Sequence, residues 1–290
     1  MVNWRRWGDD DERGALNLLD SAAVRRGLAA ARRGEVVPLG LPVQARRVPV
    51  MPPRPPVLHT MLVDGADFEA GARRAPNGLQ FADDHLSMAC HSGTHLDALS
   101  HIARDGLMYN GIPASEVRSA TGARRLGIDK VGAVVCRGVL LDVITHSAAM
   151  EAGQAITVSD LHRALRDVDT ELQPGDAVLI RTGWLARFDE RDLTWYESEP
   201  GIDLDAARWL ADQGVVLVGA DNFAVEVVPA ASGEPLPVHL ALLQERGVYL
   251  LELVDLEPLV SAAVSTFTLI LAPLRITGGV ASPVNPLAII

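Results

Sequence analysis

The sequence predicts an α/β fold with mixed sheets, in a single domain over residues 1–290 with an N-terminal extension over about residues 1–35. Two observations support this prediction. Amphipathic segments that follow helix-capping residues alternate with short apolar runs of strand length, as is typical of α/β proteins. The chain also shows no repeat of fixed period, no low-complexity linker and no break in composition that would divide it.

Helices are expected where a capping residue precedes an amphipathic run. In the first, Asp20 or Ser21 is the cap and Gly34 the end. The second is the capped amphipathic segment 157–172. Two more are expected from about Leu204 to Gln213 and from near Pro237.

Strands are expected where short runs are rich in branched apolar residues. These runs cover residues 137–143, 177–182, 215–219, 248–253 and 265–274. Two other regions are predicted to lack regular structure. The proline-rich segment 44–65 favours an extended wall or lid, because proline cannot donate a backbone hydrogen bond. The tail 277–290 is expected to be rich in loops.

The amino-acid composition argues against several classes of binding partner and cellular compartment. The net charge of −11 argues against nucleic-acid binding, which normally requires a basic face. Cys90 and Cys136 are too few for a disulfide framework, which favours a reducing cytoplasm. The N-terminus lacks the apolar stretch of a secretory signal, and no apolar run approaches the ~20 residues of a transmembrane helix. We therefore expect a cytoplasmic protein that acts on a small molecule, without a membrane partner.

The segment CHSGTHLDALSH, residues 90–101, holds three of the eight histidines. His91, Gly93, His95 and Asp97 are spaced two residues apart. In an extended strand such residues share one face, so both imidazoles and the carboxylate would converge there, with glycine leaving room beside them. A helix would instead turn Asp97 away from the histidines.

Two imidazoles and a carboxylate are a usual ligand set for zinc, manganese or iron(II), and three donors leave positions open for water or substrate. The alternative is that these are ordinary polar residues of the surface or core, which is the usual role of a single histidine. Convergence on one face favours a metal site. His101 lies four residues past Asp97 and could be a further ligand or a free acid/base, which the spacing leaves open.

Other polar residues stand where apolar residues would be expected. Glu252 ends an apolar strand and needs a buried partner or an exit to solvent, since an unpaired buried carboxylate is costly. Asp221 ends another strand and could serve an active site or cap the next turn. Glu226 lies between valines, and His239 opens a helix.

Two further histidines are pocket candidates. His85 has the same parity as His91 along the expected strand and could line the pocket, although a plain strand residue is the alternative. His59 follows the prolines, and its role is open.

The segment HSGTHLDALSH resembles the H-x-G-T-H-x-D-x-x-x-H signature of the cyclase-like metal-dependent hydrolases, the family of bacterial kynurenine formamidase and isatin hydrolase. The likeness extends over most of the chain, through blocks such as WGDDDERGALNLL, PGDAVLIRTGW, GADNFAVEVVP and PVNPLAII. Leu99 stands where formamidases usually carry proline. This difference and the long N-terminal region point to the larger cyclases of the family. Trp7 in that region is a further pocket candidate.

The resemblance implies a swivelling β/β/α fold and a homodimer or homotetramer. It assigns metal-ligand roles to His91, His95 and Asp97, with His239 and Glu252 completing a second metal position. It assigns proton transfer to His101.

The expected reaction is hydrolysis of a C–N bond (amide, lactam or formamide) or an ester-like bond in a small, cyclic or aromatic molecule. Water activated by one or two divalent ions per chain, zinc or manganese, would be the nucleophile. One alternative is a metal-dependent cyclase, dehydratase or isomerase. A second is a metal-binding protein without catalytic activity.

Overall fold

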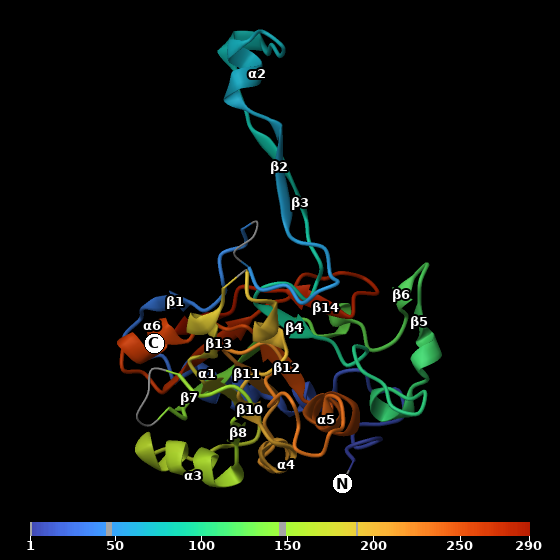
Figure 1. The fold of residues 1–290 in the computed structure, drawn as a ribbon, viewed down its shortest axis with the longest axis vertical. Coiled ribbons are helices and arrows are strands. Elements are labelled where there is room, and N and C mark those ends of the chain that lie inside the picture. Colours follow the sequence, from blue (N-terminus) through green and yellow to red (C-terminus); the bar gives the residue numbers. More distant parts are fainter. Residues whose placement is uncertain (1, 45–47, 145–148, 190) are drawn as a thin grey trace.

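The computed structural model describes residues 2–44, 48–144, 149–189 and 191–290. Its body is built on a nine-stranded mixed sheet, from which a narrow two-stranded arm projects (Figure 1). The strands of this sheet, in spatial order, are β1 (Val36–Pro38), β15 (Leu287–Ile289), β13 (Thr266–Leu271), β7 (Val134–Asp142), β9 (Ala177–Arg181), β11 (Leu217–Ala220), β12 (Tyr249–Glu252), β4 (His95–Asp97) and β14 (Ala281–Pro283).

The four central strands β7, β9, β11 and β12 run parallel, whereas the flanking strands pair antiparallel. Most residues of the parallel strands are buried; in β9, for example, Ala177, Val178 and Leu179 are fully buried. Strands that are covered on both faces have mostly apolar sequences, and the exceptions here include the partly exposed Arg137 of β7. Their carboxyl ends lie at one edge of the sheet, where α/β proteins commonly place functional residues.

The described helices lie around this sheet, except for α2, which is on the arm (Figure 1). They are α1 (Ser21–Leu28), α2 (Gly65–Glu69), α3 (Val158–Asp167), α4 (Leu204–Asp212), α5 (Pro237–His239), which continues as the π-helix Leu240–Arg246, and α6 (Glu257–Ser261). Short 3₁₀ turns occupy Gly14–Leu18, Pro76–Gly78, Tyr109–Gly111, Ala114–Glu116, Ile128–Lys130, Trp184–Arg187 and Leu193–Tyr196. No helix of the described residues has the length and apolar character needed to cross a bilayer.

The capping predictions are confirmed. The Asp20 carboxylate accepts hydrogen bonds from the backbone N–H groups of Ala22 and Ala23, at the start of α1. Thr157 and Asp160 form a reciprocal capping box on α3. The first helix nevertheless ends at Leu28, well before Gly34.

Two regions that we expected to be irregular contain strands. The C-terminal tail forms β14 and β15, which pair with β4 and with β1 and β13. The end of the proline-rich segment forms β2 (Leu58–Val63), which pairs with β3 (Asp83–Ser87). Both errors have one cause: pairing with strands distant in sequence overrides weak local preference. Residues 45–47 of the proline-rich segment lie outside the described residues.

Two smaller strand pairs complete the fold: β5 (Val117–Arg118) with β6 (Gly122–Ala123), and β8 (Ala155–Ile156) with β10 (Gly201–Ile202). The ribbon of β2 and β3 carries α2 toward its tip and extends away from the body (Figure 1). We call residues 57–88 the arm.

Candidate metal centre

Strands β4 and β12 bring the first polar side chains together. They pair antiparallel, with His95 opposite Glu252. Side chains of directly opposite residues point to the same face of a sheet, and so do residues two apart in one strand. His95, Asp97 and Glu252 therefore share a face. Nε2 of His95 lies 3.0 Å from Oε2 of Glu252 and 3.6 Å from Oδ1 of Asp97.

A turn before β4 brings His91 next to His95 and Asp97. We expected one strand from His91 to Asp97, but only His95–Asp97 is a strand, and Gly93 adopts a left-handed conformation with φ of +60°. A Cβ on Gly93 would lie 2.7 Å from Cγ1 of Val48, so the turn needs glycine both for its φ and for space. The Gly93 carbonyl accepts a 2.8 Å hydrogen bond from Nδ1 of His95, which leaves Nε2 of that ring facing the carboxylates.

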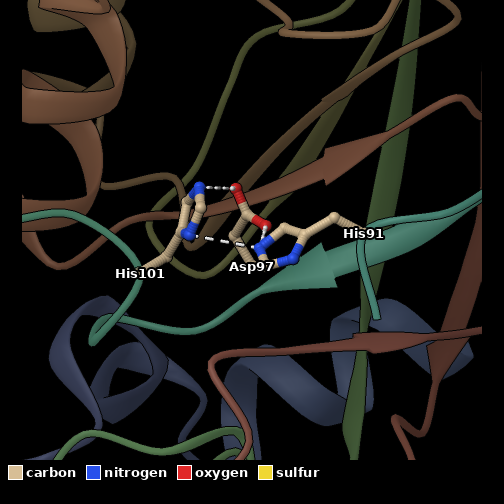
Figure 2. Close-up of side chains that lie close together, drawn as sticks. All are labelled: His91, Asp97 and His101. Carbon is tan, nitrogen blue, oxygen red and sulfur yellow. Dashed lines mark hydrogen bonds and ion pairs between the residues drawn. The ribbon is translucent and has the colours of Figure 1, made fainter. Parts of the chain in front are cut away.

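His101 follows a second turn, closed by a 2.9 Å hydrogen bond from its backbone N–H to the Ala98 carbonyl. Figure 2 shows its imidazole beside His91 and Asp97, with Nδ1 of His101 3.1 Å from Nε2 of His91. Nε2 of His91 also lies 3.2 Å from Oδ1 of Asp97, and Nε2 of His101 lies 3.9 Å from Oδ2 (Figure 2). His91, Asp97 and His101 thus form one group whose potential ligand atoms lie within 4.8 Å of one another.

A second group forms on the other side of the Asp97 carboxylate. Nε2 of His239, at the end of α5, lies 3.2 Å from Oε1 of Glu252 and 3.8 Å from Oδ2 of Asp97. Potential ligand atoms of Asp97, His239 and Glu252 again lie within 4.8 Å of one another. Asp97 therefore belongs to both groups of potential ligand residues.

Burial and charge in this cluster fit a cation. Asp97 is fully buried, and within the described chain neither of its oxygens has a hydrogen bond of good geometry; the same holds for Nε2 of His95. Leaving such atoms unpaired is costly, and a metal ion satisfies them together. Burial would raise the pKa of Asp97, but His101, His91 and His95 outweigh it and lower the pKa below its ordinary value. The side chains therefore present an anionic carboxylate surrounded by imidazoles, a set that zinc and manganese accept.

Glu226 is a residue whose role sequence reasoning missed. It is buried, and its Oε1 accepts hydrogen bonds from Nδ1 of His239 at 2.5 Å and from the His239 backbone N–H at 3.0 Å. Its Oε2 accepts from the backbone N–H of Val238 at 3.0 Å. The only sequence signal was an acid between valines. Burial lowers the pKa of His239, but Glu226 and Glu252 outweigh it and hold that pKa well above its ordinary value.

Asp221 lies outside the cluster, and it binds the turn after β9 rather than capping the turn that follows its own strand. Its carboxylate accepts hydrogen bonds from the backbone N–H and hydroxyl of Thr182 and from the backbone N–H of Gly183, at 2.6–2.7 Å. Beyond it, the buried Glu199 carboxylate accepts from the N–H groups of Phe223 and Ala224. These bonds hold the loop that carries Glu226.

The remaining pocket candidates do not contact the cluster in the described part of the chain. His59 and His85 are exposed residues of the arm, and His59 pairs with Asp84 at 2.7 Å. The parity argument for His85 was wrong because β3 ends at Ser87, so His85 and His91 are not on one continuous strand. Trp7 lies on the N-terminal segment, where the Arg6 guanidinium packs over its ring at 4.7 Å from the ring centroid.

Comparison with known proteins supports the resemblance seen in the sequence. Residues 37–227 match the family model Cyclase. The chain is 30% identical to kynurenine formamidase of Salinibacter ruber over 202 residues, covering 69% of this chain and 76% of that protein. It is 28% identical to isatin hydrolase of Roseibium aggregatum over 221 residues, covering 74% and 77%.

Solved structures agree on the fold. A crystal structure described as a novel cyclase aligns over 100% of both chains with a TM-score of 0.93 and 36% identity. An isatin hydrolase bound to the product analogue thioisatinate aligns over 93% of this chain and 98% of that chain, with a TM-score of 0.65 and 23% identity. The predicted mixed α/β fold of the cyclase type is thereby confirmed. With both its sequence and its fold matching those of cyclases, the chain belongs to the Cyclase family.

Proposed function

We propose that this protein is a metal-dependent hydrolase that cleaves a C–N bond (amide, lactam or formamide) or an ester-like bond in a small cyclic or aromatic molecule. The observation that carries this proposal is the position of Asp97, shared by two groups of potential metal ligands in a buried cluster. The names of two relatives, a formamidase and an isatin hydrolase, support the type of bond.

The cluster residues have two proposed roles: five of them would bind metal ions, and His101 would transfer protons. His91, His95 and Asp97 would hold a first zinc or manganese ion, and Asp97, His239 and Glu252 a second. A bound divalent ion lowers the pKa of water from 15.7 toward about 7 and polarises a carbonyl oxygen. The holding side chains are nearly inaccessible to solvent, which keeps their geometry rigid.

His101 has the properties that proton transfer requires. Its side chain is 20% exposed, compared with 11% for His91 and 0–4% for His95, Asp97, His239 and Glu252. Burial lowers its pKa to about 4, although Asp97 opposes the shift, so the imidazole is neutral at pH 7 and can accept a proton. In the proposed reaction His101 takes a proton from the attacking water and delivers it to the leaving nitrogen or oxygen.

Oxygen labelling tests the reaction type. Metal-loaded protein would be incubated in ¹⁸O-water with an N-formyl aromatic amine, isatin and a panel of simple lactams. Hydrolysis places one ¹⁸O atom in the product carboxylate. An unlabelled product that differs from its substrate would favour the cyclase, dehydratase or isomerase alternative. No turnover of any panel member by metal-replete protein would contradict the proposal and favour a non-catalytic metal-binding protein.

Substitution of His101 tests its role separately. His101→Ala should reduce kcat at least 100-fold, which is in the range of general acid–base catalysis, while the metal content stays at the wild-type value. His162→Ala is the control, because His162 is an exposed residue of α3 whose ring contacts that of Trp209. Loss of metal from His101→Ala would instead identify His101 as a ligand. Unchanged kcat would remove it from the mechanism.

A further inference from the structure

The proline-rich segment holds Arg54 in a restricted backbone conformation. Arg54 is the central residue of PPRPP, residues 52–56; proline fixes its own φ and favours an extended conformation for the residue before it. The backbone N–H of Arg54 donates to the Met51 carbonyl at 3.1 Å, which closes a turn. Just before this turn, the backbone N–H of Val50 donates to the hydroxyl of Tyr196 at 2.8 Å. Contacts within the chain therefore fasten the segment that carries Arg54 to the body.

The guanidinium of Arg54 contacts both a proposed metal ligand and an aromatic ring. Its Nη1 donates to the backbone carbonyl of His91 at 3.3 Å, and its central carbon lies 5.7 Å from the centroid of the Phe223 ring. The ring of Tyr196 packs edge to face on that of Phe223, with 5.2 Å between the centroids. A guanidinium has five N–H donors. The hydrogen bond to His91 uses one of them, and the others can bind a ligand.

Arg54 differs from the other arginines at similar depth, because no carboxylate in the described part of the chain pairs with it. Eight arginines of the described residues are buried or partly buried. Seven of them form ion pairs with a carboxylate: Arg26, Arg104, Arg125, Arg137, Arg163, Arg181 and Arg246. A positive charge that is partly withdrawn from water gains more from an anionic partner than an exposed charge does. An anionic ligand can therefore take the place that an acidic side chain has at the other seven.

We propose that Arg54 binds a carboxylate of the substrate, one that is separate from the bond that is cleaved. This inference rests on the proposed function, and it narrows the substrate to a small cyclic or aromatic acid. A guanidinium matches a carboxylate through two parallel N–H···O hydrogen bonds. The net charge of −11 disfavours the approach of an acid to most of the surface, so a local cation beside the metal centre is needed to bind one. Attachment at a second point also fixes the orientation of the substrate at the metal centre.

Isothermal titration calorimetry of the metal-loaded protein tests this inference with benzoate and the ortho, meta and para isomers of benzenedicarboxylate. One carboxylate of each diacid can bind at the metal centre, and the second is presented at a different position in each isomer. At least one diacid should bind the wild type about 10-fold or more tightly than benzoate does, as expected for a charge-assisted hydrogen-bonded pair. The monoamide of that diacid, which keeps its shape and loses one charge, should bind like benzoate.

Variants assign this preference to Arg54. Arg54→Gln should remove the preference for the diacid and keep the affinity for benzoate, because only the second carboxylate loses its partner. Arg54→Lys should keep part of the preference, since lysine retains the charge but not the paired geometry. Arg33→Gln is the matched control and should bind every ligand as the wild type does. Nη1 of Arg33 also donates to a backbone carbonyl, that of Ala262 at 2.9 Å, but Arg33 lies beside the end of β15, far from β4 in the sheet. Metal analysis and circular dichroism check that each variant is intact.

Two results would overturn the inference. In the first, no diacid binds the wild type more tightly than benzoate does. In the second, Arg54→Gln keeps the full preference, which would mean that the metal centre alone binds both carboxylates. Neither result depends on turnover, so the oxygen-labelling experiment tests the proposed hydrolysis separately. A protein that hydrolyses no panel member but shows the preference that depends on Arg54 would contradict the proposed reaction and support Arg54 as the acid-binding residue.

Discussion

Nδ1 of His239 lies 2.5 Å from Oε1 of Glu226, and this hydrogen bond determines which ring nitrogen of His239 faces the cluster. A carboxylate can only accept, so Nδ1 carries a hydrogen, and Nε2 is the ring nitrogen that faces Asp97 and Glu252. The same carboxylate accepts from two backbone N–H groups at the start of α5, which fixes the ring and its helix together. Partners of this kind orient metal-binding histidines.

Glu226→Ala should weaken metal binding about 10- to 100-fold, the usual effect of losing such a partner. Glu226→Gln should lose less, because its carbonyl oxygen can still accept from Nδ1 of His239. Metal affinity would be measured by competition with a chromogenic chelator, and circular dichroism would check that each variant is folded. Identical affinities for Glu226→Ala and wild type would show that Glu226 does not act through His239.

Metal removal should lower thermal stability. Without an ion, the two buried oxygens of Asp97 have no hydrogen-bond donor of good geometry in the described chain. A ligand at 100 times its Kd stabilises the folded state by about 2.7 kcal/mol, so chelation should lower Tm by several degrees and zinc or manganese should restore it. Calorimetry before and after dialysis against a chelator measures this. Asp97→Ala should show no difference between the two conditions, and a wild type equally insensitive to chelation would argue against a bound metal.

Gly93→Ala should destabilise the protein by about 1–2 kcal/mol for the left-handed backbone, plus the cost of the contact with Val48. Gly106→Ala is the matched control: Gly106 has φ of +74°, but among the described residues no atom beyond its two chain neighbours lies within 4 Å of the position of its Cβ. Urea unfolding of both variants would separate backbone strain from the clash. A double-mutant cycle with Val48→Ala should recover part of the difference. Equal destabilisation of the two glycine variants would show that the turn adjusts around Val48.

The burial of the Asp221 carboxyl group should make stability depend on pH. Burial raises the pKa of Asp221 from 3.8 to about 6, although the bonds from Thr182 and Gly183 oppose the shift. The folded state then holds a proton that the unfolded state has released, so this contribution to stability is complete below about pH 4 and lost as pH rises through about 6. The measurement is the difference in unfolding free energy between wild type and Asp221→Asn from pH 4 to 7. This difference should shrink as pH rises; a difference that grows would mean that the hydrogen bonds outweigh burial.

Local chemistry explains what could be predicted from the sequence. The caps at Asp20 and Thr157 were predictable because a cap depends only on residues a few positions away. The apolar runs of β7 and β9 identified buried strands for the same reason. The signature from His91 to His101 indicated a metal centre because its residues lie close in sequence and keep a spacing that turns and a short strand can bring together.

Other features of the fold and of the site depend on contacts between segments that are distant in sequence, and only the tertiary structure revealed them. The tail pairs with β4, and His239 and Glu252 meet Asp97, because the sheet and α5 bring these segments together. The role of Glu226 could not be predicted from the sequence, because the role of a buried carboxylate depends on which groups donate hydrogen bonds to it. His59 and His85 lie on the arm rather than at the cluster, because the chain leaves the body along β2 and returns along β3 before it reaches His91 (Figure 1). Strand pairing and burial are properties of the whole chain, whereas a local pattern reports only on its immediate neighbours.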